Sequence, residues 1–281
     1  MKTNQFNEAQ YGTMRTGFLT AFPKIFTNIK YSSEIFSYMR NLVSDYGFSF
    51  QPNMFNNQMS VEIEARHKAT SKALEKYITS DSLVIEIACG LSPRRLEFED
   101  FNYLEVDFQP VVDIKQDIYS QLGKKKLIKS LVGVDLADTA NLSQFLSGVV
   151  SKYKFKQIIV VNEGLFWYLT KEQIAAMTKE FNTAFKDIDW LWITADCPTE
   201  ILSDDEYRKV ISATANAKRG TFIDYADFTK FFKELGLRNE KHKLSDFVNY
   251  MDLSSARLFS VEELDAITKI NTYTNIAILK K

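Results

Sequence analysis

Histidine and cysteine are scarce in this chain. Among its 281 residues there are two of each, which are His67, His242, Cys89 and Cys197. Two cysteines cannot supply a disulfide framework for a chain of this length, and their scarcity fits a reducing compartment. Two histidines leave little material for a zinc site or a Ser-His-Asp triad, so we expect neither a metal centre nor that kind of nucleophilic catalysis.

Long apolar runs and targeting signals are also missing. The most apolar stretch, residues 157–169, falls short of the ~20 residues that span a bilayer, and Asn162 and Glu163 interrupt it. The first eight residues lack the apolar core and the small-residue cleavage site of a secretory signal. We therefore predict a cytoplasmic protein that does not contact a membrane.

The chain has no excess of charge of either sign. Its 35 basic and 36 acidic residues give a net charge of -1, so no global field attracts nucleic acid, and we predict no nucleic-acid partner. Glycine (10) and proline (5) are few, and neither a flexible linker nor an internal repeat is present. With 45% hydrophobic residues the chain can bury a large core, and we predict a single domain over residues 1–281.

The first eighty residues carry helical patterns. Residues 32–46 place Ile35, Phe36, Met39 and Leu42 at helical spacing, and residues 59–78 form a second long helical candidate. We predict that residues 1–80 form an N-terminal helical cap. Residues 81–281 would then form the core, with insertions on the substrate side after residue 195.

From residue 81 onward, short β-rich segments alternate with helical ones. Ser260 and Glu263 have the spacing of a capping box at the start of a late helix. The alternation is typical of an α/β fold with a parallel sheet covered by helices. The expected strands are residues 83–87, 103–106, 128–134, 157–161, 190–194, 241–247 and 274–279, and the expected helices are residues 139–152, 170–185 (capped by Thr170) and 225–235.

Two of these strands end in residues suited to a ligand. The first runs into Ala88, Cys89 and Gly90, a turn of small residues that lets a cofactor approach the backbone. The alternative is a tight turn without a ligand. The second ends at Asp107, where a carboxylate can accept hydrogen bonds from ribose hydroxyls. The alternative is that Asp107 forms a turn or caps a helix.

Two later strands also end in acidic residues. Asp135 could accept a hydrogen bond from an adenine amino group, or Asp135 or Asp138 could cap the next helix. Glu163 directly follows a buried strand and should face the crevice at the carboxyl edge of the sheet. The aromatic residues at positions 166–168 could wall an apolar pocket or belong to the core.

The glycine pattern narrows the choice of cofactor. A G-x-G-x-x-G fingerprint is absent, because the turn supplies only Gly90 and Pro93 stands at the third glycine position. A phosphate-binding P-loop is absent as well. These absences favour a nucleoside cofactor without a pyrophosphate, and S-adenosylmethionine is the obvious candidate.

The same segments resemble the leucine carboxyl methyltransferase family and its bacterial relatives that methylate oxygen atoms of small molecules. The family pattern has an arginine before the first strand, a glycine-rich turn with a downstream arginine, an acidic end to the second strand, an Asp-Leu pair and an E-G-x-x-x-Y-L motif. The matching segments are Glu86-Ile87-Ala88-Cys89-Gly90-Leu91-Ser92-Pro93-Arg94, Glu105-Val106-Asp107, Asp135-Leu136 and Glu163-Gly164-Leu165-Phe166-Trp167-Tyr168-Leu169, with Arg66 upstream.

The resemblance implies roles for these residues. Arg66 would pair with the methionyl carboxylate, Gly90 with Glu86 and Ala88 would form the cofactor turn, and Asp107 would hold the ribose. Asp135 and Leu136 would bracket adenine, and Glu163 would face the methionyl amino group or the reaction centre. Glu163 and Tyr168 are the candidates for substrate contact, and Lys115 is a loose match to a basic position. Cys89 and the Ser92-Pro93 pair depart from the usual family turn.

The resemblance also implies a Rossmann-like class I methyltransferase sheet, mostly parallel with its last strand antiparallel. The expected enzyme is an S-adenosylmethionine-dependent O-methyltransferase, acting as a monomer or homodimer on a carboxylate or hydroxyl of a small molecule. A protein C-terminal carboxylate is the less favoured acceptor. A carboxylate needs no general base, which agrees with two histidines, whereas a hydroxyl calls for one. The alternatives are a catalytically silent cofactor-binding protein of this fold and a nucleotide-dependent oxidoreductase.

Overall fold

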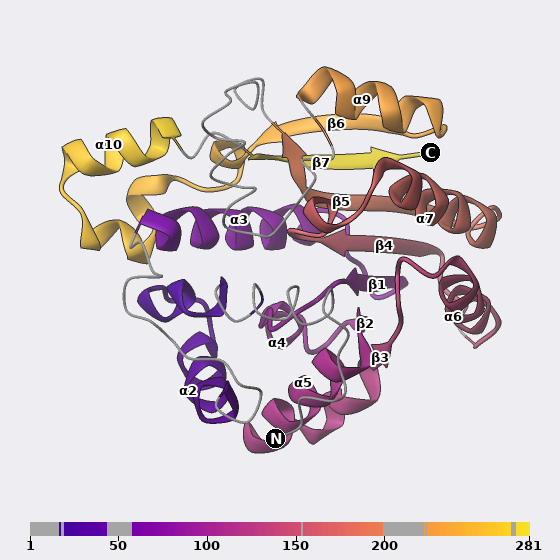
Figure 1. Cartoon of the computed structure of the whole chain (residues 1–281), viewed down its shortest axis with the longest axis horizontal. Helices are drawn as coiled ribbons and strands as arrows, with labels where there is room; N and C mark the ends of the chain where they lie inside the picture. The colour runs from indigo at the N-terminus through magenta and orange to yellow at the C-terminus, as the bar shows by residue number, and fades with distance from the viewer. Residues whose placement is uncertain are drawn as a thin grey trace.

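The computed structural model describes residues 17, 20–43, 58–152, 154–198, 222, 224–270 and 274–281. In this part of the chain, seven strands form one sheet in the order β3-β2-β1-β4-β5-β7-β6 (Figure 1). The strands are β1 (Ser82–Ile87), β2 (Asn102–Asp107), β3 (Leu131–Gly133), β4 (Gln157–Asn162), β5 (Asp189–Pro198), β6 (Arg238–Lys243) and β7 (Thr274–Lys280).

Helices connect these strands. The α-helices are α2 (Ser32–Val43), α3 (Gln58–Glu75), α4 (Arg94–Glu97), α5 (Gln109–Gln121), α6 (Thr139–Lys152), α7 (Lys171–Ala184), α9 (Tyr225–Glu234) and α10 (Val261–Ile270). Short 3-10 helices are η2 (Pro23–Phe26), η5 (Lys125–Ser130), η6 (Phe166–Tyr168), η8 (Leu244–Asp246), η9 (Tyr250–Asp252) and η10 (Ser254–Leu258).

The sheet is parallel except at one edge. β1 pairs in parallel with β2 and β4, β2 with β3, and β4 with β5, whereas β7 runs antiparallel to both β5 and β6. The predicted α/β class, with a mostly parallel sheet and an antiparallel last strand, is confirmed. Parallel pairing brings the carboxyl ends of β1 to β4 to the same edge of the sheet, where ligands bind in folds of this kind.

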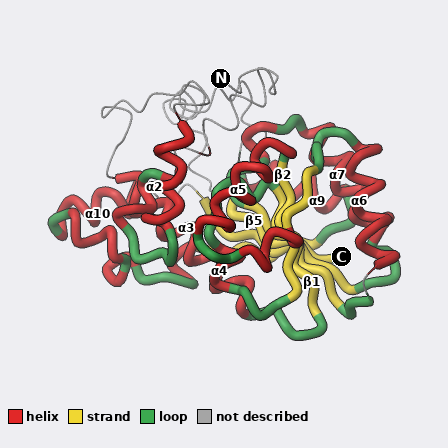
Figure 2. Tube along the Cα trace, turned by 90° about the horizontal axis from the view of Figure 1, so that it is seen from below, coloured by secondary structure: helices red, strands yellow, loops and turns green. Residues whose placement is uncertain are grey.

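Both faces of the sheet are buried, which explains the nearly continuous apolar runs of its strands. In β4, Ile158 and Val160 pack with α6, α7 and α9, while Ile159 and Val161 pack with α3 and α10. Figure 2 shows these two groups of helices on opposite sides of the strands. The two hydrophobic cores therefore cover both faces of the sheet and hold the carboxyl ends of its strands in place.

Helix starts follow the capping chemistry. Thr170 caps α7 in a capping box with Gln173, as its hydroxyl accepts from the Gln173 N–H while the Gln173 side chain accepts from the Thr170 N–H. Ser260 and Glu263 make the same reciprocal pair before α10. Both predicted caps are confirmed.

Two predicted strands were wrong in part. Residues 128–130 belong to η5, and only Leu131–Gly133 pair as β3, because a short apolar run does not by itself distinguish a strand from a helical turn. The strand predicted at residues 241–247 instead begins at Arg238 and ends at Lys243. There Asp246 accepts a hydrogen bond from the Lys243 N–H, and the chain continues into η8. Positions 44–46 of the first predicted helix lie outside the described residues.

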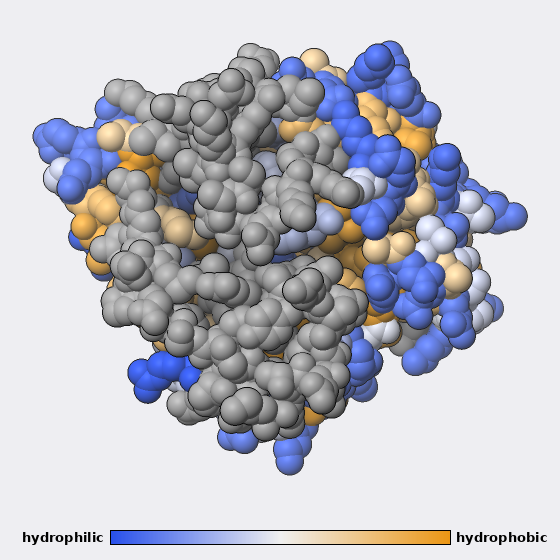
Figure 3. All heavy atoms as spheres, viewed as in Figure 1, coloured by the Kyte–Doolittle hydropathy of each residue, from blue (hydrophilic) through white to orange (hydrophobic). Residues whose placement is uncertain are grey.

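The surface agrees with a folded domain of mixed charge. Figure 3 shows hydrophilic residues along the side formed by α6 and α7 and apolar patches near α10, where Leu258 and Val261 are exposed. None of the helices in the described ranges has the length and apolarity that a membrane span requires. The predicted division into a cap over residues 1–80 and a core over residues 81–281 stays a prediction.

Candidate functional site

The turn after β1 has an unusual backbone conformation. Ala88 and Gly90 both have positive φ, at 50° and 49°, in the left-handed region that costs a residue with a side chain about 1–2 kcal/mol. A non-glycine residue held there marks a turn whose shape the surrounding structure dictates, and such strain is typical of functional sites. No atom lies within 4 Å of the place where a Cβ on Gly90 would be. The backbone of Gly90 is therefore open to close approach by a ligand.

Asp107 binds this turn to the end of β2. Its Oδ2 accepts from the Gly90 N–H at 2.7 Å, and its Oδ1 accepts from the Phe108 N–H at 2.8 Å. Burial raises the pKa of Asp107 despite these two bonds. Each carboxylate oxygen can accept a second hydrogen bond, so Asp107 retains capacity for two hydroxyl groups of a ligand beside Gly90.

Glu163 lies at the other end of the site, among cations. Its Oε1 accepts from Nη2 of Arg94, and its Oε2 lies 3.6 Å from Nε of Arg66. Burial alone would raise the pKa of Glu163, but the neighbouring cations, Arg94 foremost, hold it well below its usual range. Glu163 is therefore ionised at neutral pH.

Lys24, on η2, contributes a further cation that sequence reasoning missed. Burial lowers its pKa to about 8, with the charges of Arg94 and Arg66 acting in the same direction and Glu163 opposing them. The lowered pKa means that nearby negative charges do not fully compensate for the burial of the charged Lys24 side chain. An anion bound beside Lys24 would stabilise its charged form. Lys24 carries no local sequence signal, because it lies far from the strand-end motifs and reaches them only through the fold.

Arg94 links two carboxylates at the site, those of Glu86 and Glu163. It is fully buried on α4 and donates from Nη1 to Glu86 Oε1 at 2.6 Å, while Tyr103 donates to Glu86 Oε2 at 2.7 Å. Both oxygens of Glu86 are thus engaged by the protein. Glu86 holds Arg94, which in turn holds Glu163. In the sequence, the position of Arg94 just after the glycine turn was the signal that could have linked it to the site. The sequence does not show that its side chain points inward.

The remaining predicted residues occupy different surroundings. Asp135 follows β3, and its Oδ1 accepts from the Ala137 N–H at 2.9 Å, whereas Asp138 caps α6 through the Ala140 N–H. Leu136 is buried in the core beside α6. Tyr168 lies on η6. For Asp135 and Tyr168 the predicted roles stay predictions.

Lys115 is a structural residue in this geometry. It is buried on α5, and its Nζ lies 2.6 Å from Oε1 of Glu105, whose other oxygen accepts from the Tyr119 hydroxyl. Lys115 is therefore not a solvated surface residue. The pair lies on the α5 side of β2 and neutralises two buried charges against each other.

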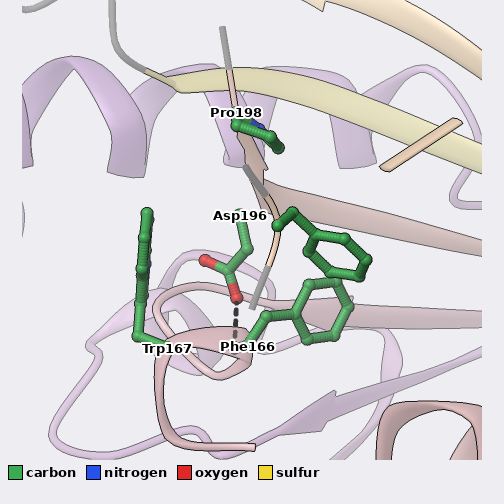
Figure 4. Close-up of a pocket in the computed structure, with 5 residues that line it drawn as sticks. Phe166, Trp167, Asp196 and Pro198 are labelled. Carbon is green, nitrogen blue, oxygen red and sulfur yellow. Dashed lines mark hydrogen bonds between the residues drawn. The ribbon is translucent and has the colours of Figure 1, made fainter. Parts of the chain in front are cut away.

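A small aromatic pocket adjoins the segment that carries Glu163. It is lined by Phe166, Trp167, Asp196, Pro198 and Phe222. Figure 4 shows the Trp167 ring on one side of the Asp196 carboxylate and the ring of Phe166 on the other. Of the three aromatic residues at positions 166–168, Phe166 and Trp167 line this pocket, whereas Tyr168 is not among its lining residues. Phe166 also packs into the core through Trp192, Phe228 and Phe232.

Asp196, at the end of β5, shapes this pocket and was not foreseen. Its Oδ1 accepts from the Gly164 N–H at 2.5 Å, and its Oδ2 accepts from the N–H groups of Leu165 and Phe166 and from the side-chain amide of Asn162. Burial raises its pKa against these bonds. One carboxylate therefore organises the turn that follows Glu163.

The geometry fits S-adenosylmethionine. The open backbone at Gly90 and the carboxylate of Asp107 suit the ribose. The anionic Glu163 suits an ammonium group, and the incompletely compensated Lys24, with Arg66, suits a carboxylate. An amino-acid head group carries both of these charges.

Solved structures of other proteins share this fold. No curated protein matches the chain by sequence. Three solved structures are similar to it: PigF with SAH (11% identity, TM-score 0.50, covering 89% of this chain and 69% of PigF), TnmH (10%, 0.48, 86% and 60%), and magnesium protoporphyrin IX methyltransferase (ChlM) from Synechocystis PCC 6803 with bound SAM (13%, 0.48, 94% and 97%). The chain thus spans 60% of the length of TnmH. The likeness to PigF shows the shared Rossmann-like fold.

The family is shown by sequence. The model of the leucine carboxyl methyltransferase family matches residues 38–182, which run from α2 to α7 and include all four strand-end residues of the site. The predicted family is confirmed by this match. Because the match covers just over half of the chain, this protein belongs to the leucine carboxyl methyltransferase family.

Proposed function

We propose that this enzyme methylates an oxygen atom of a small molecule, with a carboxylate favoured over a hydroxyl as the acceptor. The observation that carries this proposal is the arrangement of Glu163, Lys24 and Arg66 opposite the open turn at Gly90 and Asp107. When bound, S-adenosylmethionine supplies an electrophilic methyl group on a sulfonium centre. The protein then has to hold that group, align an oxygen with it and exclude water.

The protonation states favour an acceptor that is already ionised. The pKa of Glu163 lies well below its usual range, so this carboxylate is a weak base at neutral pH. His67 is buried and hydrogen bonded to Glu97 and Arg94. A hydroxyl acceptor calls for a base near neutral pH, whereas a carboxylate needs none.

The pocket beside Glu163 supports an acceptor with a flat apolar body. Its aromatic lining favours stacking on Trp167. All four hydrogen bonds to Asp196 come from the surrounding turn, which supports a structural role for this carboxylate. The predicted monomer or homodimer, the cap formed by residues 1–80 and the cytoplasmic location remain part of the proposal.

The first test is ligand binding measured by thermal shift. The purified protein is heated with S-adenosylmethionine, S-adenosylhomocysteine, NADH or NADPH, and the series is repeated with Asp107→Ala, with Arg66→Ala and with Asp138→Ala as a control. Ligand at about 100 times its Kd adds about 2.7 kcal/mol to the free energy of unfolding. We expect both adenosyl ligands to raise Tm in the wild type and the control, and not in Asp107→Ala. A shift with the nicotinamides alone would instead support an oxidoreductase.

The second test separates an enzyme from a silent binding protein. The protein is incubated with S-adenosylmethionine labelled on the methyl carbon and a panel of aromatic and aliphatic carboxylic acids, each paired with the alcohol of the same carbon skeleton. We expect label in the methyl esters of aromatic acids. Label in the ethers alone would refute the preference for a carboxylate, and binding without transfer to any acceptor would favour the silent protein.

A further inference from the structure

His67 lies on α3, directly behind the charged end of the site, and the sequence assigned it no role. It is buried, with 1% of its surface exposed. Its Nε2 is 2.9 Å from Oε1 of Glu97, and its Nδ1 is 3.3 Å from Nη2 of Arg94. Both ring nitrogens are therefore within hydrogen-bond distance of a charged partner.

These partners dictate where the proton of the imidazole lies. A guanidinium can only donate, so Nδ1 of His67 must accept the hydrogen bond from Arg94. A carboxylate can only accept, so Nε2 must carry the proton and donate it to Glu97. The imidazole is thus neutral with its proton on Nε2. Burial, and next the positive charge of Arg94, lower the pKa of His67, in agreement with the neutral form.

Ser71, one turn further along α3, closes a ring of hydrogen bonds. Its Oγ accepts from Nε of Arg94 at 3.2 Å and donates to Oε2 of Glu97 at 2.8 Å. We call these four side chains, His67, Ser71, Arg94 and Glu97, the His67 ring. In this ring each donor faces an acceptor, so the plane of the Arg94 guanidinium has one orientation that satisfies all of them. Nη1 of Arg94 donates to Glu86, and Nη2, which also faces His67, donates to Glu163.

We propose that the His67 ring makes Arg94 a positioning residue for Glu163. Arg94 occupies Oε1 of Glu163, which leaves Oε2 on the side of Arg66, where the proposed function places the amino-acid head of the cofactor. The proposal rests on that function. A lysine at position 94 would supply the charge without the planar fork, and could not serve several acceptors in fixed directions. The neutral imidazole is required because a protonated Nδ1 would turn a donor toward Arg94.

The ring itself can be tested without any cofactor. Because the chain has two histidines, ¹⁵N-labelling of histidine gives two side-chain spin systems, and His242→Asn assigns them. We expect His67 to show the neutral tautomer with the proton on Nε2 at pH 7. A tautomer with the proton on Nδ1, or an imidazolium, would contradict the hydrogen bonds that define the His67 ring.

Two variants of His67 each keep one of the two hydrogen bonds of the imidazole and remove the other. In His67→Asn the amide oxygen takes the place of Nδ1 and still accepts from Arg94. In His67→Gln the amide nitrogen takes the place of Nε2 and still donates to Glu97, but the acceptor for Arg94 is lost. We expect the Kd of S-adenosylhomocysteine, measured by calorimetry, to rise about tenfold in His67→Gln and at most about twofold in His67→Asn, because only His67→Gln loses the hydrogen bond that orients Arg94.

Arg95→Lys is the matched control. Arg95 is the buried neighbour of Arg94, but its guanidinium donates to the backbone carbonyls of Phe98 and Glu99 and not to the ring. We expect Arg94→Lys to raise the Kd of S-adenosylhomocysteine and the KM of S-adenosylmethionine at least tenfold, and Arg95→Lys to leave both unchanged even where it lowers Tm.

The outcomes distinguish this proposal from the function on which it rests. If the wild type binds neither adenosyl ligand, the proposed function fails and the positioning role fails with it. If the wild type binds and His67→Gln binds equally well, or if both His67 variants weaken binding alike, the proposed function stands and the positioning role is refuted.

Discussion

Replacing Lys24 by methionine should stabilise the protein and weaken cofactor binding. Methionine keeps an unbranched stem of similar length and removes the charge. Burial lowers the pKa of Lys24 from 10.5 to about 8, so the folded state holds this proton less tightly than the unfolded chain does. At about 1.36 kcal/mol per pKa unit, the buried charge costs about 3 kcal/mol near neutral pH. Lys24→Met removes that cost.

The pH dependence gives the prediction its sign. Below pH 8 Lys24 is charged in both states, and the full cost is present. Between pH 8 and 10.5 the folded state has lost the proton while the unfolded chain still binds it, so the free energy of unfolding of the wild type rises relative to that of the variant. We therefore expect the variant to be more stable by about 3 kcal/mol at pH 7, and the two proteins to converge toward pH 10.5.

The assay is urea unfolding across this pH range, together with calorimetry of S-adenosylhomocysteine at pH 7. Lys186→Met is the control, because this lysine is exposed and its replacement should change the free energy of unfolding by less than about 0.5 kcal/mol. Loss of a charged partner for the ligand carboxylate should weaken binding by about 10- to 100-fold. A variant that is less stable than the wild type at pH 7, or that binds the ligand equally well, would refute the argument.

Three further predictions concern the buried polar groups. Glu105→Gln should lower the free energy of unfolding by about 3–5 kcal/mol because Lys115 loses its compensating charge, and combining it with Lys115→Met should recover most of that loss in urea unfolding; a single-variant loss below about 1 kcal/mol would contradict this. Asp196→Asn should cost about 2 kcal/mol or more, since one amide oxygen cannot serve donors on both sides of the carboxylate, whereas the exposed Asp189→Asn should cost far less; equal losses would show that the Asp196 carboxylate does not stabilise the turn after Glu163. The folded-state pKa of His67 is lowered, so the unfolded chain binds its proton more tightly, and stability should fall as the pH drops below about 6.5. In parallel acid titrations of Tm, His67→Gln should lack this component, and identical curves would show that His67 does not titrate in this way.

Much of the fold follows from local chemistry that can be read along the chain. The continuous apolar runs of β1 and β4 indicate strands buried on both faces, and the Thr170 cap marks the start of α7 to within one residue. The run around residues 128–134 was ambiguous because a short apolar segment fits a helical turn as well as a strand. Its first residues formed η5.

The sequence by itself determined which residues stand at the ends of the parallel strands, because each strand and the residue that follows it are adjacent in the chain. It therefore predicted that Gly90, Asp107, Asp135 and Glu163 would share one edge of the sheet, and the parallel pairing of β1, β2, β3 and β4 bears this out. Only the tertiary structure decided what surrounds them. Lys24 and the His67 ring come from helices outside that strand order, and their protonation states depend on burial and on distances between side chains, which no local pattern encodes.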